Sequence, residues 1–267
     1  LGELLDACQS MERRVAAMTV VDFAPVGREP KIVIADTDLG WGAVDVLGGL
    51  REREPRMPAD AVLEPDSTLA AQAELGQLDG VKDLIYIKSN SGIGGALIVD
   101  GALVLGANQL AAALGHVPLV PDGEPCACGQ YGCLVTVAGP DAIIEAAGMT
   151  SVVELQGLNA ALAEFARRVE AGDRLAVSTW DVAVDWISRA LQILTVVTDP
   201  EVIVLGGYWA LLAESVASRF GESRPVNSDG SKWLAPRVLA GQLGEDAALL
   251  GAVWAARDAL LENPLVI

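Results

Sequence analysis

Four stretches of the chain have the residue pattern of α-helices. The first places apolar side chains three and four positions apart. The second begins at Asp66, a good capping residue, continues through an Ala-rich interior and meets Gly76 as a natural stop. The third is long, has Asp181 as its candidate cap and is broken by Asp199 and the proline after it. The predicted helices cover residues 1–17, 66–76, 181–197 and 247–261.

Short apolar and β-branched runs between these helices predict β-strands. Asp100 and Gly101 form a strong two-residue turn, so the run before them is expected to belong to a β-hairpin. The sequence EVIVLGG is typical of a buried strand that enters a glycine turn. The predicted strands cover residues 31–35, 84–88, 94–99 and 201–207. Strands that alternate with long helices predict an α/β fold.

Composition and charge argue against a membrane protein, a secreted protein and a nucleic-acid-binding protein. Hydrophobic residues make up 52% of the 267 positions and charged residues 20%, as in folded globular proteins. There is no run of about 18 purely apolar residues and no apolar secretion core at the start, so we expect a soluble, cytoplasmic protein without a membrane partner. Eighteen basic residues against 36 acidic ones give a net charge of -18, which argues against nucleic-acid binding by this chain.

A cluster of cysteines follows the only histidine of the chain. His116 precedes Cys126, Cys128 and Cys133, and one imidazole with three thiolates fills the four positions of a tetrahedral zinc ion. Such a closed set is structural, because a catalytic zinc needs an open position for water. The Pro- and Gly-rich segment 118–132 has little apolar surface to bury, so a metal crosslink would order it. The alternative is a set of buried free cysteines beside a core histidine.

The sequence around this cluster resembles a known family. The segment GANQLAAALGHVPLVPDGEPCACGQYGCL is similar to the signature of the ROK family, which groups sugar kinases with sugar-responsive transcriptional repressors. Further segments agree in order, namely LGWGAVDV, LEPDSTLAAQAE, SNSGIGGALIVDG, DPEVIVLGGYWALL and LGEDAALLGAVWAA. The resemblance covers nearly the whole chain, from about residue 36 to residue 257.

The resemblance implies a two-lobed, actin-like ATPase fold of the sugar-kinase kind, here with an incomplete first lobe. Residues 1–80 would form a partial N-terminal lobe. Residues 81–267 would form the C-terminal lobe, which carries the zinc loop and the surface of a homodimer or homotetramer.

The resemblance also implies a catalytic site. Asp66 matches the family's general base, which takes a proton from a sugar hydroxyl. The matching nucleotide contacts are Gly92, Gly94, Gly95, Gly206 and Gly207. Each position has a plainer alternative, because Asp66 could serve only as a helix cap and the glycines only as turns.

Four departures from the family pattern led us to interpret these sites as vestigial. The family's opening strand and DxGxT phosphate loop have no match in the chain. Pro65 replaces a sugar-binding Asn, and Ala113 and Val135 replace sugar-binding Glu residues. Each lost charged partner removes about 1.5–3 kcal/mol of hydrogen bonding.

From these departures we predict the effector-binding and oligomerisation part of a ROK-type transcriptional regulator that is not an enzyme. Its effector would be an unidentified small molecule, and it would reach DNA only through a winged helix absent from this chain. One alternative is a ROK kinase that phosphorylates a hexose or an N-acetylhexosamine with ATP. Another is a zinc-stabilised scaffold that binds only protein.

Overall fold

The computed structural model describes residues 1–35, 39–224, 229–230, 233 and 235–262. The chain divides into two compact units. Unit 1 comprises Leu1–Ala73, Leu105–Ala111 and Asp246–Ile267, and unit 2 comprises Glu74–Val104 and Ala112–Glu245. This division differs from the expected one at residue 80, because the C-terminal helix belongs with the N-terminal residues.

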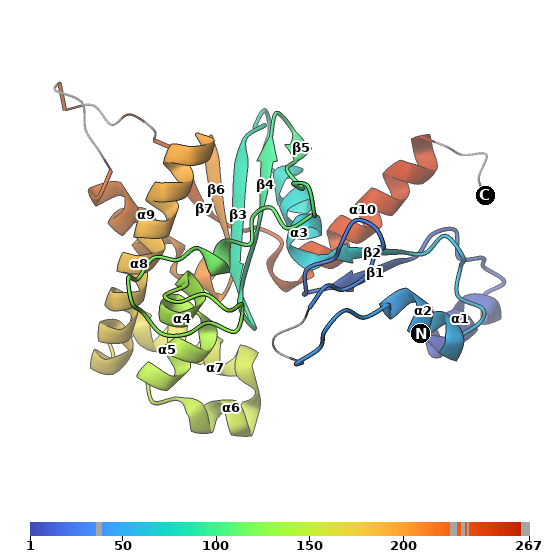
Figure 1. The fold of residues 1–267 in the computed structure, drawn as a ribbon, viewed down its shortest axis with the longest axis horizontal. Helices are drawn as coiled ribbons and strands as arrows, with labels where there is room; N and C mark the ends of the chain where they lie inside the picture. The colour runs from blue at the N-terminus through green and yellow to red at the C-terminus, as the bar shows by residue number, and fades with distance from the viewer. Residues whose placement is uncertain (36–38, 225–228, 231–232, 234, 263–267) are drawn as a thin grey trace. The chain divides into compact units, whose positions relative to one another are not determined.

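Unit 1 contains a two-stranded parallel sheet and four helices (Figure 1). The strands are β1 (Thr19–Asp22) and β2 (Val62–Pro65), and the helices are α1 (Gly2–Ser10), α2 (Val46–Arg53), α3 (Asp66–Leu75) and α10 (Ala247–Glu262). The last two residues of α3 already belong to unit 2. Val26, Val33 and Leu63 are fully buried in the core of unit 1. Gly251 brings α10 close to the backbone of Leu69, so a side chain there would overlap α3.

Two predicted elements of unit 1 were wrong. The helix expected over residues 1–17 ends at Ser10, and Glu12 takes a left-handed conformation with φ 53° that stops the helix. The strand expected over residues 31–35 is absent from the described residues of that run. Only Val33 pairs, in isolated bridges with Val26 and Val44. Val33 is fully buried, so this residue packs in the core of unit 1. The helix expected over residues 66–76 is confirmed as α3.

Unit 2 is built on a five-stranded sheet of order β5-β4-β3-β6-β7. Strands β3 and β4 pair antiparallel, and β3, β6 and β7 run parallel to one another. The strands are β3 (Leu84–Ser89), β4 (Ile93–Val99), β5 (Ala102–Leu103), β6 (Val202–Gly207) and β7 (Arg237–Ala240). The β3–β4 hairpin strands and β6 were predicted from the sequence. Asp100 and Gly101 both have positive φ, as the predicted two-residue turn between β4 and β5 requires.

The helices of unit 2 pack against this sheet, and in Figure 1 they lie together along one side of it. They are α4 (Leu134–Ala138), α5 (Pro140–Ala146), α6 (Thr150–Gln156), α7 (Leu158–Glu170), α8 (Arg174–Thr198) and α9 (Ala213–Glu222), with short 3-10 turns η1 (Leu114–His116), η2 (Tyr208–Leu212) and η3 (Gly244–Asp246). Ile85 and Ile87 of β3 and Ile203 of β6 are fully buried in the core beneath these helices. The alternation of strands and helices confirms the α/β class.

Helix α8 begins earlier than the sequence predicted. Its cap is Asp173, whose carboxylate accepts hydrogen bonds from the backbone N–H groups of Leu175 and Ala176 at 3.1 and 2.9 Å. Asp181 lies within the helix and is not its cap. The predicted end is confirmed, because Asp199 takes the left-handed conformation that closes the helix.

Within the described residues, no helix is both long enough and apolar enough to cross a lipid bilayer.

Candidate functional site

His116 is held at the end of η1 by close packing against β4. A side chain at Gly95 would lie 2.5 Å from Leu114 Cδ1 and 2.7 Å from the carbonyl oxygen of Tyr86. A side chain at Gly115 would overlap the carbonyl oxygen of Ile93. Both glycines are therefore required for η1 to approach the strand. Of the predicted nucleotide-binding glycines, Gly95 thus has a structural role that the sequence did not reveal.

The cysteines lie on a folded loop that returns to α4. The N–H of Gly129 donates to the carbonyl of Cys126 at 2.9 Å, which closes a tight turn around Cys128. Gly129 has φ 90° and Gly132 has φ 66°, so both adopt the left-handed conformations expected of glycines in this loop. Cys133 immediately precedes α4 and is fully buried. The loop thus brings thiols from both of its ends toward η1.

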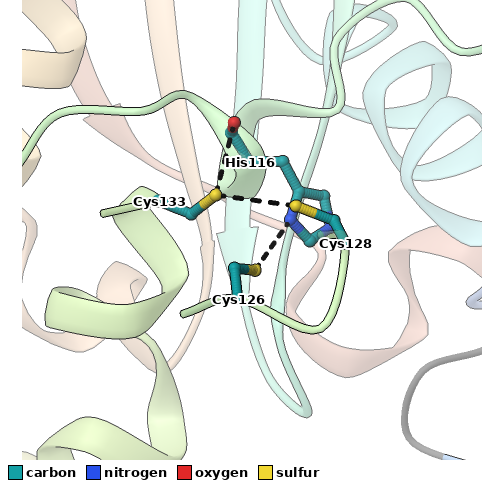
Figure 2. A group of neighbouring side chains, drawn as sticks. All are labelled: His116, Cys126, Cys128 and Cys133. Carbon is teal, nitrogen blue, oxygen red and sulfur yellow. Dashed lines mark hydrogen bonds between the residues drawn. The ribbon is translucent and has the colours of Figure 1, made fainter. Parts of the chain in front are cut away.

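The four side chains converge on one point, as Figure 2 shows. Their candidate ligand atoms all lie within 4.8 Å of one another. Cys126 Sγ lies 3.5 Å from His116 Nδ1, and Cys128 Sγ lies 3.7 Å from Cys133 Sγ. A tetrahedral zinc with bonds of ~2.3 Å to sulfur and ~2.0 Å to nitrogen requires edges of about 3.5 Å (S···N) and about 3.8 Å (S···S). The donor set and both of these distances therefore fit a zinc ion.

The protonation of these groups follows from their burial and mutual contacts. Burial lowers the pKa of His116, which keeps the imidazole neutral and able to bind a metal. Burial raises the pKa of Cys133 to about 12, with further contributions from Cys128 and Cys126. Burial also opposes ionisation of Cys128, but hydrogen bonds from the backbone of Gln130 and from the other two thiols lower its pKa.

Gln130 is a supporting residue that the sequence did not indicate. Its side-chain amide lies 3.6 Å from Cys128 Sγ and 3.5 Å from the carbonyl oxygen of His116, so it faces both halves of the cluster. Residues that orient metal ligands in this way are common around zinc sites. Cys8, the remaining cysteine, lies in α1 of unit 1 and is not part of the cluster.

Asp66 is the first residue of α3 and follows the last residue of β2. Its side chain is half-buried. Thr68 donates a hydrogen bond to the carbonyl of Pro65 at 2.8 Å, which fixes the transition from strand to helix. A carboxylate at the first turn of a helix is stabilised by the helix dipole. Asp66 therefore presents its carboxylate at the start of a helix.

The sheet of unit 2 aligns most of the predicted nucleotide-binding glycines. Gly94 of β4 and Gly206 of β6 flank Lys88 of β3 in one row across the sheet. Gly207 ends β6 opposite Ser89, and Gly92 lies in the turn between β3 and β4. The structure thus gathers these glycines at the carboxyl ends of the parallel strands β3 and β6. Ligands of open α/β sheets bind at such strand ends.

Gly207 has the most restricted backbone of this group. It has φ 62° and ψ -150°, a conformation reserved almost entirely for glycine. A methyl group there would also overlap the carbonyl oxygen of Ser89 and Oδ1 of Asn90.

We expect Gly207→Ala to lower the free energy of unfolding by about 3 kcal/mol or more, because strain and overlap add. The matched control is Gly92→Ala, where a Cβ would meet no atom within 4 Å and φ is not left-handed, so a change within ~0.5 kcal/mol is expected. Urea unfolding of both variants measures the difference. Equal midpoints for the two variants would refute the assigned conformation.

The three substituted positions, among the four departures from the family pattern, lie beside these elements. Pro65 ends β2 next to Asp66, Ala113 immediately precedes η1, and Val135 lies in the first turn of α4. Val135 packs against the core of unit 2. None of the three side chains can form a hydrogen bond.

Comparisons with known proteins bear on these assignments. The chain matches the sequence model of the ROK family over residues 1–259. It is 29% identical to a glucokinase of Halalkalibacterium halodurans, over 81% of this chain and 68% of that protein. It is 30% identical to an N-acetylmannosamine kinase of Escherichia coli, over 73% of this chain and 64% of that protein.

Solved structures share the fold. A ROK glucokinase from Streptomyces griseus, in complex with glucose and AMPPNP, superimposes with a TM-score of 0.77 at 24% identity, covering 96% of this chain and 87% of that one. A ROK transcriptional regulator, a homolog of the E. coli MLC protein, superimposes with a TM-score of 0.73 at 22% identity, covering 99% and 69%. These likenesses place the chain in the sugar-kinase-like fold that kinases and regulators share.

The interpretation of the chain as a non-enzymatic regulator was wrong. Relatives similar to it in sequence include glucokinases and N-acetylmannosamine kinases, which favours the alternative of a sugar kinase. The error has a physical reason. The loss of three polar side chains can change which sugar fits a site without abolishing phosphorylation, so the substitutions at positions 65, 113 and 135 do not exclude a kinase.

Proposed function

The chain belongs to the ROK family, and from this membership we propose that it serves the ATP-dependent phosphorylation of a sugar, either a hexose or an N-acetylhexosamine. The observation that carries the proposal is the sequence likeness to glucokinases and N-acetylmannosamine kinases together with a carboxylate, Asp66, at the position of the family base. The chain spans 68% of the length of the H. halodurans glucokinase, so the activity is proposed for the full-length protein.

Asp66 would act as the general base of this reaction. Its carboxylate would accept the proton of the attacking sugar hydroxyl as the oxygen bonds to the γ-phosphorus of ATP, while ADP leaves. Phosphoryl transfer depends mainly on positioning and on stabilisation of charge. A carboxylate at the rigid start of α3 meets the first requirement.

Backbone groups at the ends of β3 and β6 would bind the phosphates of ATP. Gly92 would leave the main chain uncovered there, because a Cβ at this position meets no atom within 4 Å, so an anion could approach its backbone closely. The net charge of -18 makes such local donors necessary, because the protein as a whole repels a nucleotide. The Mg²⁺ that accompanies ATP would offset part of this repulsion.

The substituted positions favour a sugar that carries an apolar group. Pro65, Ala113 and Val135 cannot pair with hydroxyls, and a buried hydroxyl without a partner costs about 1–3 kcal/mol. An acetamido methyl has no such requirement. We therefore infer a preference for an N-acetylhexosamine over glucose.

We also propose that His116, Cys126, Cys128 and Cys133 hold one structural zinc ion. Bound there, zinc would act as a crosslink between η1, the loop and the start of α4. Ala113, one of the substituted positions, is only three residues from His116, so the crosslink would fix the backbone beside the sugar-selecting position. The four ligands would leave no position open for catalysis by the metal.

Self-association of the chain into a homodimer or homotetramer is a further part of the proposal. Helix α8 exposes large apolar side chains at spacings of seven, eleven and four residues, which place them on one face of the helix. They are Leu175, Val182, Ile193 and Val197, with exposed fractions of 52, 59, 44 and 74%. Exposed apolar side chains along one helix face are typical of a protein interface.

A coupled assay of ADP formation tests the proposed activity. The full-length protein is given Mg-ATP and, in separate reactions, glucose, N-acetylglucosamine or N-acetylmannosamine. We expect sugar-dependent turnover of ~1–1,000 per second for the preferred sugar, with kcat/KM higher for an N-acetylhexosamine than for glucose. ADP formation that does not depend on any sugar would contradict the proposal.

A further inference from the structure

Glu74 is an almost fully buried carboxylate near the end of α3, with only 2% of its surface exposed. Its Oε2 accepts a hydrogen bond from the backbone N–H of Gln242, and its Oε1 accepts one from the backbone N–H of Leu243, both at 2.9 Å. A buried carboxylate is costly unless it is hydrogen-bonded. Here each oxygen has its own backbone donor, from a segment 168 residues away in the sequence.

The segment that Glu74 binds is continuous with the edge of the sheet. Gly241 follows β7 and donates its N–H to the carbonyl of Leu205 in β6 at 2.8 Å. A side chain at Gly241 would lie 2.9 Å from Glu74 Oε1 and 3.2 Å from that same carbonyl oxygen. Leu205 immediately precedes Gly206 and Gly207. The Glu74 carboxylate, near the end of α3, therefore binds residues that directly follow Gly241, which is itself hydrogen-bonded to the strand that ends in the glycine turn.

The same helix carries Asp66 at its other end. The two carboxylates are eight positions apart, which is about 12 Å along an α-helix. The chain also passes from unit 1 to unit 2 between Ala73 and Glu74, and back again after Glu245. Asp66 and Glu74 therefore belong to one helix, and Glu74 binds the segment after β7.

We propose that Glu74 is a positioning residue, which fixes α3 to the residues after β7 and thereby sets the place of Asp66. This inference rests on the proposed function in one respect, namely that Asp66 is the base. Misplacement of a reacting group by about 1 Å can cost a hundredfold in rate. Loss of the Glu74 contact should therefore lower kcat, although Glu74 itself touches neither sugar nor ATP.

Glu201 provides a matched control. Its Oε1 accepts hydrogen bonds from the backbone N–H groups of Lys82 and Asp83 at 2.8 and 3.2 Å, so, like Glu74, it accepts two backbone hydrogen bonds. Glu201 is exposed and lies before β6, at the opposite end of that strand from the glycine turn. The substitution Glu201→Gln thus removes an equivalent carboxylate without touching α3.

The test compares Glu74→Gln, Gly241→Ala and Glu201→Gln in the full-length protein. In Glu74→Gln an amide N–H₂ faces a backbone N–H, so one donor loses its acceptor. In Gly241→Ala the carboxylate stays but is displaced by the new methyl group. We expect kcat to fall at least tenfold in both, with KM for the preferred sugar within about threefold of wild type. Glu201→Gln should keep the wild-type kcat.

Amide hydrogen exchange gives a readout that does not require activity. We expect the amides of Gln242 and Leu243 to exchange at least tenfold faster in Glu74→Gln, and those of α3 to lose protection with them. Glu201→Gln should leave both segments unchanged. If the wild-type protein phosphorylates no sugar but Glu74→Gln still speeds amide exchange at Gln242 and Leu243, the proposed function is refuted. The hydrogen bonds of Glu74 to these two residues are then still established. If the wild-type protein is active, the positioning role of Glu74 is overturned when Glu74→Gln and Gly241→Ala keep the wild-type kcat. It is likewise overturned when amide exchange in these variants is unchanged.

Discussion

Replacing Cys133 with serine should remove the metal from the protein and loosen the segment 118–132. Cys133 is the one fully buried cysteine of the cluster, and a serine hydroxyl is a poor zinc ligand. Structural zinc sites bind with apparent free energies of about 10–16 kcal/mol in small domains, and this binding energy contributes to folding. We expect the zinc content to fall from about one ion per chain to near zero. The thermal midpoint should fall by roughly 10 °C, corresponding to several kcal/mol.

The matched control is Cys8→Ser, which removes the cysteine of α1 that lies outside the cluster. This variant should keep both its zinc and its thermal midpoint. Elemental analysis of protein purified without added metal, together with a thermal melt, measures both quantities. Wild-type protein that is folded and free of zinc would contradict the assignment, as would equal midpoints for the two variants.

The zinc content of the protein should also fall as the pH is lowered. Thiolates and a neutral imidazole are the binding forms, so protons compete with the metal and affinity falls as pH falls. The pKa of Cys133 is raised to about 12, so this thiol is protonated at pH 7 in the absence of metal. Zinc binding must therefore displace its proton, and acidification reverses that step.

Asp66→Asn should lower kcat by about 10²- to 10⁴-fold, the usual contribution of a general base. Asparagine keeps the shape of the side chain at the start of α3 but cannot accept the proton of the sugar hydroxyl. KM for the sugar should change little by comparison, because the amide can still hydrogen-bond a hydroxyl. Steady-state kinetics of the full-length protein measures both constants.

Asp45→Asn is the control for this substitution. Asp45 caps α2 in the same unit by accepting a hydrogen bond from the N–H of Gly48 at 2.8 Å, and asparagine caps a helix equally well. We expect wild-type kcat and stability in this variant. A kcat in Asp66→Asn within threefold of that in Asp45→Asn would show that Asp66 is not the base.

Local features of the sequence predicted the local features of the fold. Asp100 and Gly101 formed the expected turn because the positive φ of both residues is a property of the two residues themselves. The cluster of His116 and the cysteines could be predicted in the same way, since its members lie within 18 positions of one another. The start of α8 was missed because Asp173 and Asp181 both qualify as caps, and only the backbone donors around Asp173 distinguish them.

Features that depend on distant residues could not be predicted. Glu74 has the pattern of a solvent-exposed helix residue, and its partners Gln242 and Leu243 lie far along the chain. The C-terminal helix α10 joined unit 1 for a similar reason, since Gly251 fits it against Leu69 of α3. The function was misread because the sequence shows which polar side chains are missing but not what the remaining ones contact.

The most direct test of the sugar-kinase assignment is to follow the phosphoryl group itself. The full-length protein is incubated with Mg-ATP that carries a label on its γ-phosphoryl group and with N-acetylmannosamine, N-acetylglucosamine and glucose in competition, and the products are separated by mass. The account predicts that the wild-type protein forms labelled sugar phosphate, with more label on an N-acetylhexosamine than on glucose. Asp66→Asn should form at least a hundredfold less labelled sugar phosphate. Label that remains on ATP or appears only as inorganic phosphate in the wild-type reaction would contradict it.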